Sequence, residues 1–136
     1  MADLKASLEN LGRAFARLDE FASLPVTHQR DQAGVVQAFE FTFELFWKTF
    51  QKLAPELGLQ ATSPRQAIQA GLRMGAIPIE DEAAWGLMLR DRNQTSHLYN
   101  DQLAKEVFLR VVQQYLPAFS RALENLRAYV ARGGIG

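Results

Sequence analysis

Apolar side chains recur at steps of three and four residues along most of this chain, and that spacing restricts its fold more than any other feature. Residues at these steps lie on one face of an α-helix. A first stripe runs from Leu4 to Phe21, and a second, rich in phenylalanine, runs from Val36 to Leu53 with Trp47 beside it. Aromatic stripes are more typical of a bundle core than of a cofactor site. The spacing therefore predicts two long helices of a helical bundle.

Capping residues predict a short third helix. Ser63 is expected to be its N-cap, Pro64 its first residue and Gln66 the second half of a capping box. The helix is expected to run to about Met74. It should end at Gly75, because glycine best tolerates the left-handed conformation that follows many helices.

Two further helices complete the predicted fold. The acidic residues 80–82 suit the start of a fourth helix, which carries Arg92. Asn100 is the expected N-cap of a long last helix, which Pro117 is expected to kink or split. No stretch alternates with period two, as a half-buried strand would. The sequence thus predicts one all-α domain over residues 1–136, an up-and-down bundle of four to five helices.

Composition narrows the classes of function. Lys plus Arg and Asp plus Glu both number 15, so no bulk positive field holds nucleic acid, and RNA would need a local site. The absence of cysteine excludes disulfides, thiolate metal sites and cysteine nucleophiles, and two histidines argue against a dedicated zinc site. No apolar run approaches the ~20 residues that cross a bilayer, and the N-terminus lacks a signal-peptide core. We expect a cytoplasmic protein with no membrane partner and no metal.

The polar segment from Arg90 to Asp101 is the one concentrated functional signal. Eleven polar or amphipathic side chains there surround a single aliphatic residue, Leu98. The segment lies where the fourth helix is expected to end, so one interpretation is a polar turn between helices. However, arginine offers a planar charged fork for phosphate, and histidine has the unperturbed pKa nearest neutrality. Arg92 and His97 together could therefore hold or cleave a phosphodiester.

Helix geometry limits how Arg92 and His97 can meet. Residues five apart on an ideal helix lie about 140° apart around the axis, whereas Asn93 and His97, four apart, share a face. Arg92 and His97 converge only if the helix ends or distorts between them, or if they meet across a dimer axis.

Other polar residues have two interpretations each. Glu40, Glu44 and Lys48 follow one face of the second helix. In one interpretation they form a solvated charged stripe in which Glu44 pairs with Lys48. In the other, Glu44 or Lys48 borders the functional cleft. Arg90 either contacts phosphate or pairs with Asp91 or a neighbouring helix.

Residues 92–99, RNQTSHLY, match the R-x4-H-x-Y pattern of the HEPN family. Within that family the chain resembles the small proteins encoded beside minimal nucleotidyltransferases, which are labelled nucleotidyltransferase substrate-binding proteins. The aromatic helix 37–48, the helix start at 63–65 and the helix that carries Trp85 share this resemblance, which covers about residues 4–130. The resemblance implies a bundle of four or five helices that dimerises with the motif near the dimer cleft.

The resemblance also implies two linked activities. In the first, the protein is a toxin-like, metal-independent endoribonuclease, in which His97 is the general base or acid and Arg92 stabilises the phosphorane charge. In the second, the minimal nucleotidyltransferase uses ATP to adenylylate Tyr99, which silences the site. The chain itself would then need no cofactor, and the two proteins would form a toxin–antitoxin pair.

Two other hypotheses stay open on the sequence alone. The chain could be a non-catalytic subunit that binds a nucleotide or another substrate and presents it to the nucleotidyltransferase. It could also be a dimeric bundle without a ligand. In that case no substitution in the motif would have a phenotype, and nucleotide would not stabilise the fold.

Overall fold

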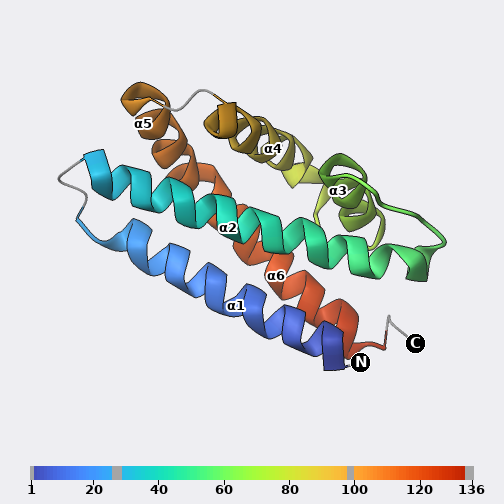
Figure 1. Ribbon diagram of the computed structural model, residues 1–136. Helices are drawn as coiled ribbons and strands as arrows, with labels where there is room; N and C mark the ends of the chain where they lie inside the picture. Colours follow the sequence, from blue (N-terminus) through green and yellow to red (C-terminus); the bar gives the residue numbers. More distant parts are fainter. Residues whose placement is uncertain (1, 26–28, 98–99, 134–136) are drawn as a thin grey trace.

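The computed structural model consists of helices packed side by side (Figure 1). It describes residues 2–25, 29–97 and 100–133, with side chains at all of these positions except 2, 29, 30, 96 and 97. The α-helices are α1 (Ala2–Ser23), α2 (Gln29–Leu53), α3 (Pro64–Arg73), α4 (Glu82–His97), α5 (Asp101–Arg110) and α6 (Leu116–Ala131). Short 3-10 helices, Ala54–Leu57 and Ile79–Asp81, precede α3 and α4.

A turn at Val111–Tyr115 joins α5 to α6, so that these two helices form one long last helix. Within the described ranges the elements therefore form five rods, and no strand occurs there. The prediction of an all-α bundle of four to five helices with a long last helix is confirmed. Among these helices, none has both the length and the apolar character that a membrane crossing requires.

An aromatic core lies between α2, α4 and the last helix. Phe46 of α2 stacks on Phe119 of α6 with the ring centroids 4.9 Å apart, and Trp85 of α4 meets Phe46 edge-on at 5.3 Å. Phe39, two turns before Phe46, stacks on Tyr115 at 5.1 Å. All five rings are fully buried. Burial of one such side chain stabilises a fold by about 2–3 kcal/mol, so this cluster holds α4 and the last helix against α2.

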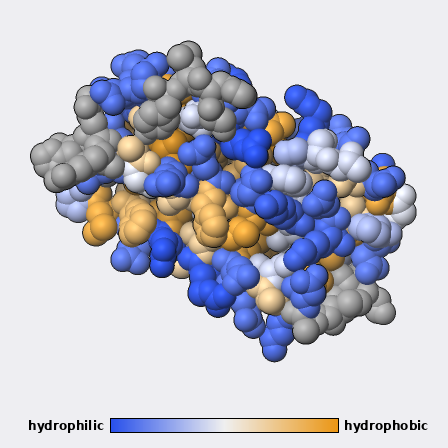
Figure 2. Space-filling view, in the orientation of Figure 1, coloured by the Kyte–Doolittle hydropathy of each residue, from blue (hydrophilic) through white to orange (hydrophobic). Residues whose placement is uncertain are grey.

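The α1–α2 side of the bundle retains an apolar surface. Phe21 and Phe41 are 41% and 61% exposed and line a groove of about 590 Å³ between the two helices, together with Arg13 and Arg17. Figure 2 shows apolar side chains over α1 and α2, surrounded by polar ones. The sequence stripe from Leu4 to Phe21 is therefore buried or half-buried along most of α1 and exposed at its end.

The cap of α3 differs in one detail from the predicted capping box. Ser63 Oγ accepts from the Gln66 backbone N–H at 3.2 Å, as expected. Gln66 Oε1, however, accepts from the backbone N–H of Thr62 at 2.7 Å and from its hydroxyl at 2.8 Å, instead of closing on Ser63. Thr62 offers two donors to one oxygen, which explains the shift. Gly75 follows the helix with a φ of 79°, as predicted.

The last helix begins at its predicted cap and is interrupted before its proline. Asn100 Oδ1 accepts from the Leu103 N–H at 2.8 Å. The segment Val111–Tyr115 is a π turn, in which each hydrogen bond spans five residues rather than four. Pro117 stands in the first turn of α6, where its missing N–H is best tolerated. The expected split is observed, but the irregular turn lies ahead of the proline.

Candidate functional site

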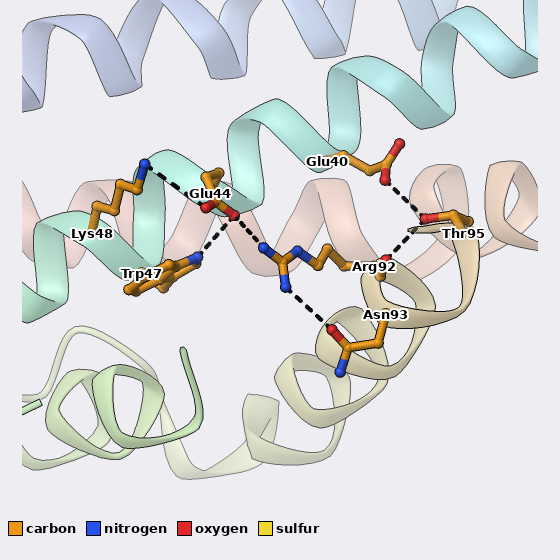
Figure 3. Close-up of polar contacts among 7 residues, drawn as sticks. All are labelled: Glu40, Glu44, Trp47, Lys48, Arg92, Asn93 and Thr95. Atoms are coloured by element: carbon orange, nitrogen blue, oxygen red, sulfur yellow. Dashed lines mark hydrogen bonds and ion pairs between the residues drawn. The ribbon is translucent and has the colours of Figure 1, made fainter. Parts of the chain in front are cut away.

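Arg92 reaches from α4 to α2, where its guanidinium meets the carboxylate of Glu44 (Figure 3). Arg92 Nη2 donates to Glu44 Oε2 at 3.2 Å, and Arg92 Nη1 donates to Asn93 Oδ1 at 3.2 Å. The exposed fractions of the arginine and glutamate side chains are 31% and 29%. The arginine that the sequence singles out thus lies at the surface with its guanidinium oriented by neighbouring side chains.

Glu44 gathers donors from its own helix as well. Trp47 Nε1 donates to the same Oε2 atom at 3.0 Å, and Lys48 Nζ lies 3.8 Å from Oε1 (Figure 3). The predicted pairing of Glu44 with Lys48 is therefore present, although 54% of the lysine side chain is exposed. An indole N–H and two cations are groups that bind anions well, and here they surround a carboxylate of the chain itself.

A second carboxylate of α2 contacts α4 one turn away. Thr95 Oγ1 donates to Glu40 Oε2 at 2.9 Å, and only 8% of Thr95 is exposed. Glu40 and Glu44 are four residues apart, and Arg92 and Thr95 are three apart, so one face of α2 meets one face of α4. Both carboxylates thus lie against α4 and do not form the solvated stripe that was one interpretation of the sequence.

Asp91 forms a buried network that sequence reasoning missed. Its carboxylate is 0% exposed and accepts from Arg110 Nε at 2.7 Å, from Arg110 Nη2 at 2.8 Å and from the Tyr115 hydroxyl. Arg90 Nη2 lies 3.5 Å from the same carboxylate, which favours the pairing interpretation of Arg90. Burial, followed by the bond to Asp91, raises the pKa of Tyr115, and the bond to Asp91 raises the pKa of Arg110.

The sequence does contain a signal for this network. On α4, Asp91 follows Trp85 and Met88 at steps of three, and all three side chains are fully buried. Burial of a carboxylate on an apolar face costs free energy unless charged or polar groups form hydrogen bonds with it. The position of Asp91 on this buried face of α4 could therefore have predicted that its carboxylate has a buried partner.

Two of the predicted site residues lie partly or wholly outside the described residues. Helix α4 continues without a break to His97, so positions 92 and 97 are separated by about 140° around its axis. The side chain of His97 lies outside the described part of the structure, and so does the whole of Tyr99. The structure thus brings Arg92, Asn93, Glu44 and Lys48 together. In the parts of the chain that are described, no cluster of three or more His, Asp or Glu forms a metal site.

Similarity to known proteins now identifies the family. The family model described as nucleotidyltransferase substrate binding protein like matches residues 6–128. The chain belongs to this family. A crystal structure of a protein from Thermus thermophilus is also similar, with 33% sequence identity and a TM-score of 0.70. The similarity covers 87% of this chain and 96% of the Thermus chain. No curated protein matches the sequence.

Membership of the nucleotidyltransferase substrate-binding-like family confirms the coarser part of the sequence resemblance. The matched residues 6–128 include both faces of the polar contact between α2 and α4. The HEPN assignment and the role of the R-x4-H-x-Y pattern stay predictions.

Proposed function

We propose that this nucleotidyltransferase substrate-binding-like protein is a toxin-like, metal-independent endoribonuclease of the HEPN type, silenced by a separately encoded minimal nucleotidyltransferase. One observation carries the proposal: Glu44 holds the Arg92 guanidinium at the surface of α4, within the most polar segment of the chain. An arginine with a fixed, partly exposed guanidinium is suited to a phosphodiester. The family description supports the partner, because it names a nucleotidyltransferase.

The unbroken α4 favours a site shared by two chains. Arg92 and His97 lie about 140° apart on this helix, so one chain does not direct both positions at the same phosphate. A homodimer supplies a second copy of each residue and removes this restriction. It also provides two histidines, and the reaction needs both a general base and a general acid.

The proposed reaction is a transesterification within the RNA. His97 removes the proton of a ribose 2′-hydroxyl, and the 2′ oxygen forms a bond to the adjacent phosphorus. The bond from phosphorus to the 5′ oxygen of the next nucleotide breaks, and the partner subunit's His97 donates a proton to that oxygen. Arg92 stabilises the negative charge on the phosphorane. The products are a 2′,3′-cyclic phosphate and a 5′-hydroxyl. The reaction consumes no water and uses no metal ion.

Tyr99 is the proposed target of the partner enzyme. Its phenolic oxygen would attack the α-phosphorus of ATP, lose its proton and release pyrophosphate, so that AMP remains on the tyrosine. Tyr99 is two residues from His97 in the sequence. The added nucleotide would place bulk and negative charge beside the site and repel an RNA phosphate.

Cleavage of RNA by the purified protein tests the first activity. A single-stranded RNA labelled at one end should be cut by the wild type and by Arg65→Ala, an exposed arginine on α3. Arg92→Ala and His97→Ala should each reduce the rate by at least about a hundredfold. A wild type that does not cut RNA, or an Arg92→Ala variant that cuts like Arg65→Ala, would contradict the proposal.

Mass spectrometry after co-expression with the neighbouring nucleotidyltransferase tests the second activity. The intact mass should increase by whole AMP units in the wild type and should stay unchanged in Tyr99→Phe. Equal modification of Tyr99→Phe would place the target elsewhere. Light scattering on the unmodified protein should give the mass of a dimer, and a monomer would remove the shared site.

A non-catalytic binding subunit is the second candidate, and one observation favours it. The Arg92 guanidinium is paired with Glu44, as expected for a binding site in which an anionic ligand competes with a carboxylate of the chain for the arginine. This function predicts that nucleotide alone raises the unfolding temperature of the wild type and not of Arg92→Ala. It also predicts that expression of the chain without its partner is harmless to the cell.

A further inference from the structure

Two bidentate ion pairs connect the α4 region to the last helix. Before α4 begins, Asp81 accepts from Arg121 Nε and Nη2 at 2.7 and 2.9 Å. Toward its end, Asp91 accepts from Arg110 Nε and Nη2 at 2.7 and 2.8 Å. The pairs have the same geometry but different surroundings, because Arg121 is 51% exposed and Arg110 only 22%.

The π turn explains how Asp91 obtains two partners from the last helix. Arg110 and Tyr115 are five residues apart, and on a regular α-helix they would lie about 140° apart. In the turn Val111–Tyr115 one hydrogen-bonded turn spans five residues, so the two side chains project from nearly the same face. Both therefore reach the same carboxylate.

The core holds the Asp91 network rigidly. The Tyr115 ring is fully buried and stacks on Phe39 of α2, and its hydroxyl donates to Asp91. Asp91 is therefore bound to a side chain that the aromatic core already fixes. This makes the network a reference point for the rotation of α4 about its own axis.

That rotation determines where Arg92 points. Successive residues lie about 100° apart around a helix, so fixing Asp91 toward the last helix turns Arg92 toward α2. A rotation of α4 by about 20° would move a group about 6 Å from the axis by about 2 Å. Such a shift would be enough to break the 3.2 Å contact between Arg92 Nη2 and Glu44 Oε2.

We infer that Asp91, held by Arg110 and Tyr115 at the π turn, is a positioning residue that fixes the rotation of α4 and so directs Arg92 toward Glu44, where it is placed for phosphate. The inference rests on the proposed function for the role of Arg92, but the orientation itself can be measured without RNA. Asp91 contacts no substrate in this scheme. It acts only by fixing the rotation of α4 about its own axis.

The test compares Asp91→Asn with Asp81→Asn, which disrupts the other bidentate pair. In protein labelled with 15N-arginine, the Nε–Hε resonance of Arg92 should move or broaden in Asp91→Asn and stay in place in Asp81→Asn. Single-turnover RNA cleavage, measured where circular dichroism shows both variants folded, should fall by about ten- to a hundredfold in Asp91→Asn. Asp81→Asn should cleave within about threefold of the wild type, because its pair is the more exposed one. If Asp91→Asn does not fold, Tyr115→Phe removes one donor and keeps the ring on Phe39.

The outcomes separate this inference from the proposed function. An Arg92 resonance that is unchanged in both Asp91→Asn and Tyr115→Phe would overturn the positioning role. Equal losses of cleavage in Asp91→Asn and Asp81→Asn would also overturn it, because the effect would then be general destabilisation. If the wild type cuts no RNA but the Arg92 resonance responds to Asp91→Asn and not to Asp81→Asn, the positioning role stands and the endoribonuclease proposal fails.

Discussion

Removing the charge of Glu44 should reveal how strongly it holds Arg92. The attraction between unit charges 3.2 Å apart is about 5 kcal/mol at an effective dielectric constant of about 20. Desolvation and lost side-chain freedom offset most of it, and exposed pairs contribute about 0.2–1 kcal/mol. Less than a third of each side chain is exposed. We therefore expect a coupling free energy near the top of that range, about 1 kcal/mol.

A double-mutant cycle measures this coupling. Urea unfolding of the wild type, Glu44→Gln, Arg92→Gln and the double variant gives the coupling free energy, and glutamine keeps an acceptor for Trp47. The matched control is the same cycle between Glu44 and Lys48. The Lys48 ammonium lies 3.8 Å from Glu44 Oε1 and the lysine side chain is 54% exposed, so its coupling should be about 0.3 kcal/mol or less. In about 1 M salt the first coupling should decrease to about 0.5 kcal/mol. An Arg92 coupling no larger than that of Lys48 would refute the argument that Glu44 orients the guanidinium.

Three further predictions concern stability, each measured by urea or thermal unfolding. Burial raises the pKa of Tyr115 above its ordinary value of about 10, so the protonated phenol stabilises the fold fully below about pH 10 and less as pH rises further. Above about pH 10 the free energy of unfolding should therefore decrease more steeply in the wild type than in Tyr115→Phe. Gly86 lies on an open helical surface, so Gly86→Ala should raise the free energy of unfolding by about 1 kcal/mol. Gly71→Ala should lower it by about 1–3 kcal/mol, because the added Cβ would lie 2.8 Å from Ile77 Cδ1. Asn100→Ala removes the cap of α5 and should cost about 1 kcal/mol, so an unchanged midpoint would show that the cap contributes nothing.

Most of the fold follows from features that act over a few residues. The apolar stripes predict the helices because burial of one face drives their packing, and the caps at Ser63 and Asn100 form because each side chain reaches an N–H within its own turn. The predicted capping box was wrong in one partner. Gln66 Oε1 accepts from the backbone N–H and the hydroxyl of Thr62 instead of the backbone N–H of Ser63, because Thr62 offers two donors. Such competition between neighbouring donors is not visible in a spacing rule.

The site required information that helical periodicity lacks. The chemistry of its segment singles out Arg92 as a candidate, but its contact with Glu44 depends on how α2 and α4 are aligned along each other. The network of Asp91 depends on the π turn, and spacing alone assigns Arg110 and Tyr115 to different faces of an α-helix. Local patterns single out candidate site residues by their side-chain chemistry. The packing of helices that are distant in sequence decides which of them meet.

The π turn also indicates where a chain of this family can change length. A π turn contains one residue more than the α-helical turn that it replaces, while the helices on either side keep their rotational phase. Deletion of one residue between Arg110 and Tyr115 would leave the two side chains four apart on a regular α-helix, where they again share a face. A sequence aligned with a single-residue gap at this point would therefore retain both partners of Asp91 and the same orientation of α6.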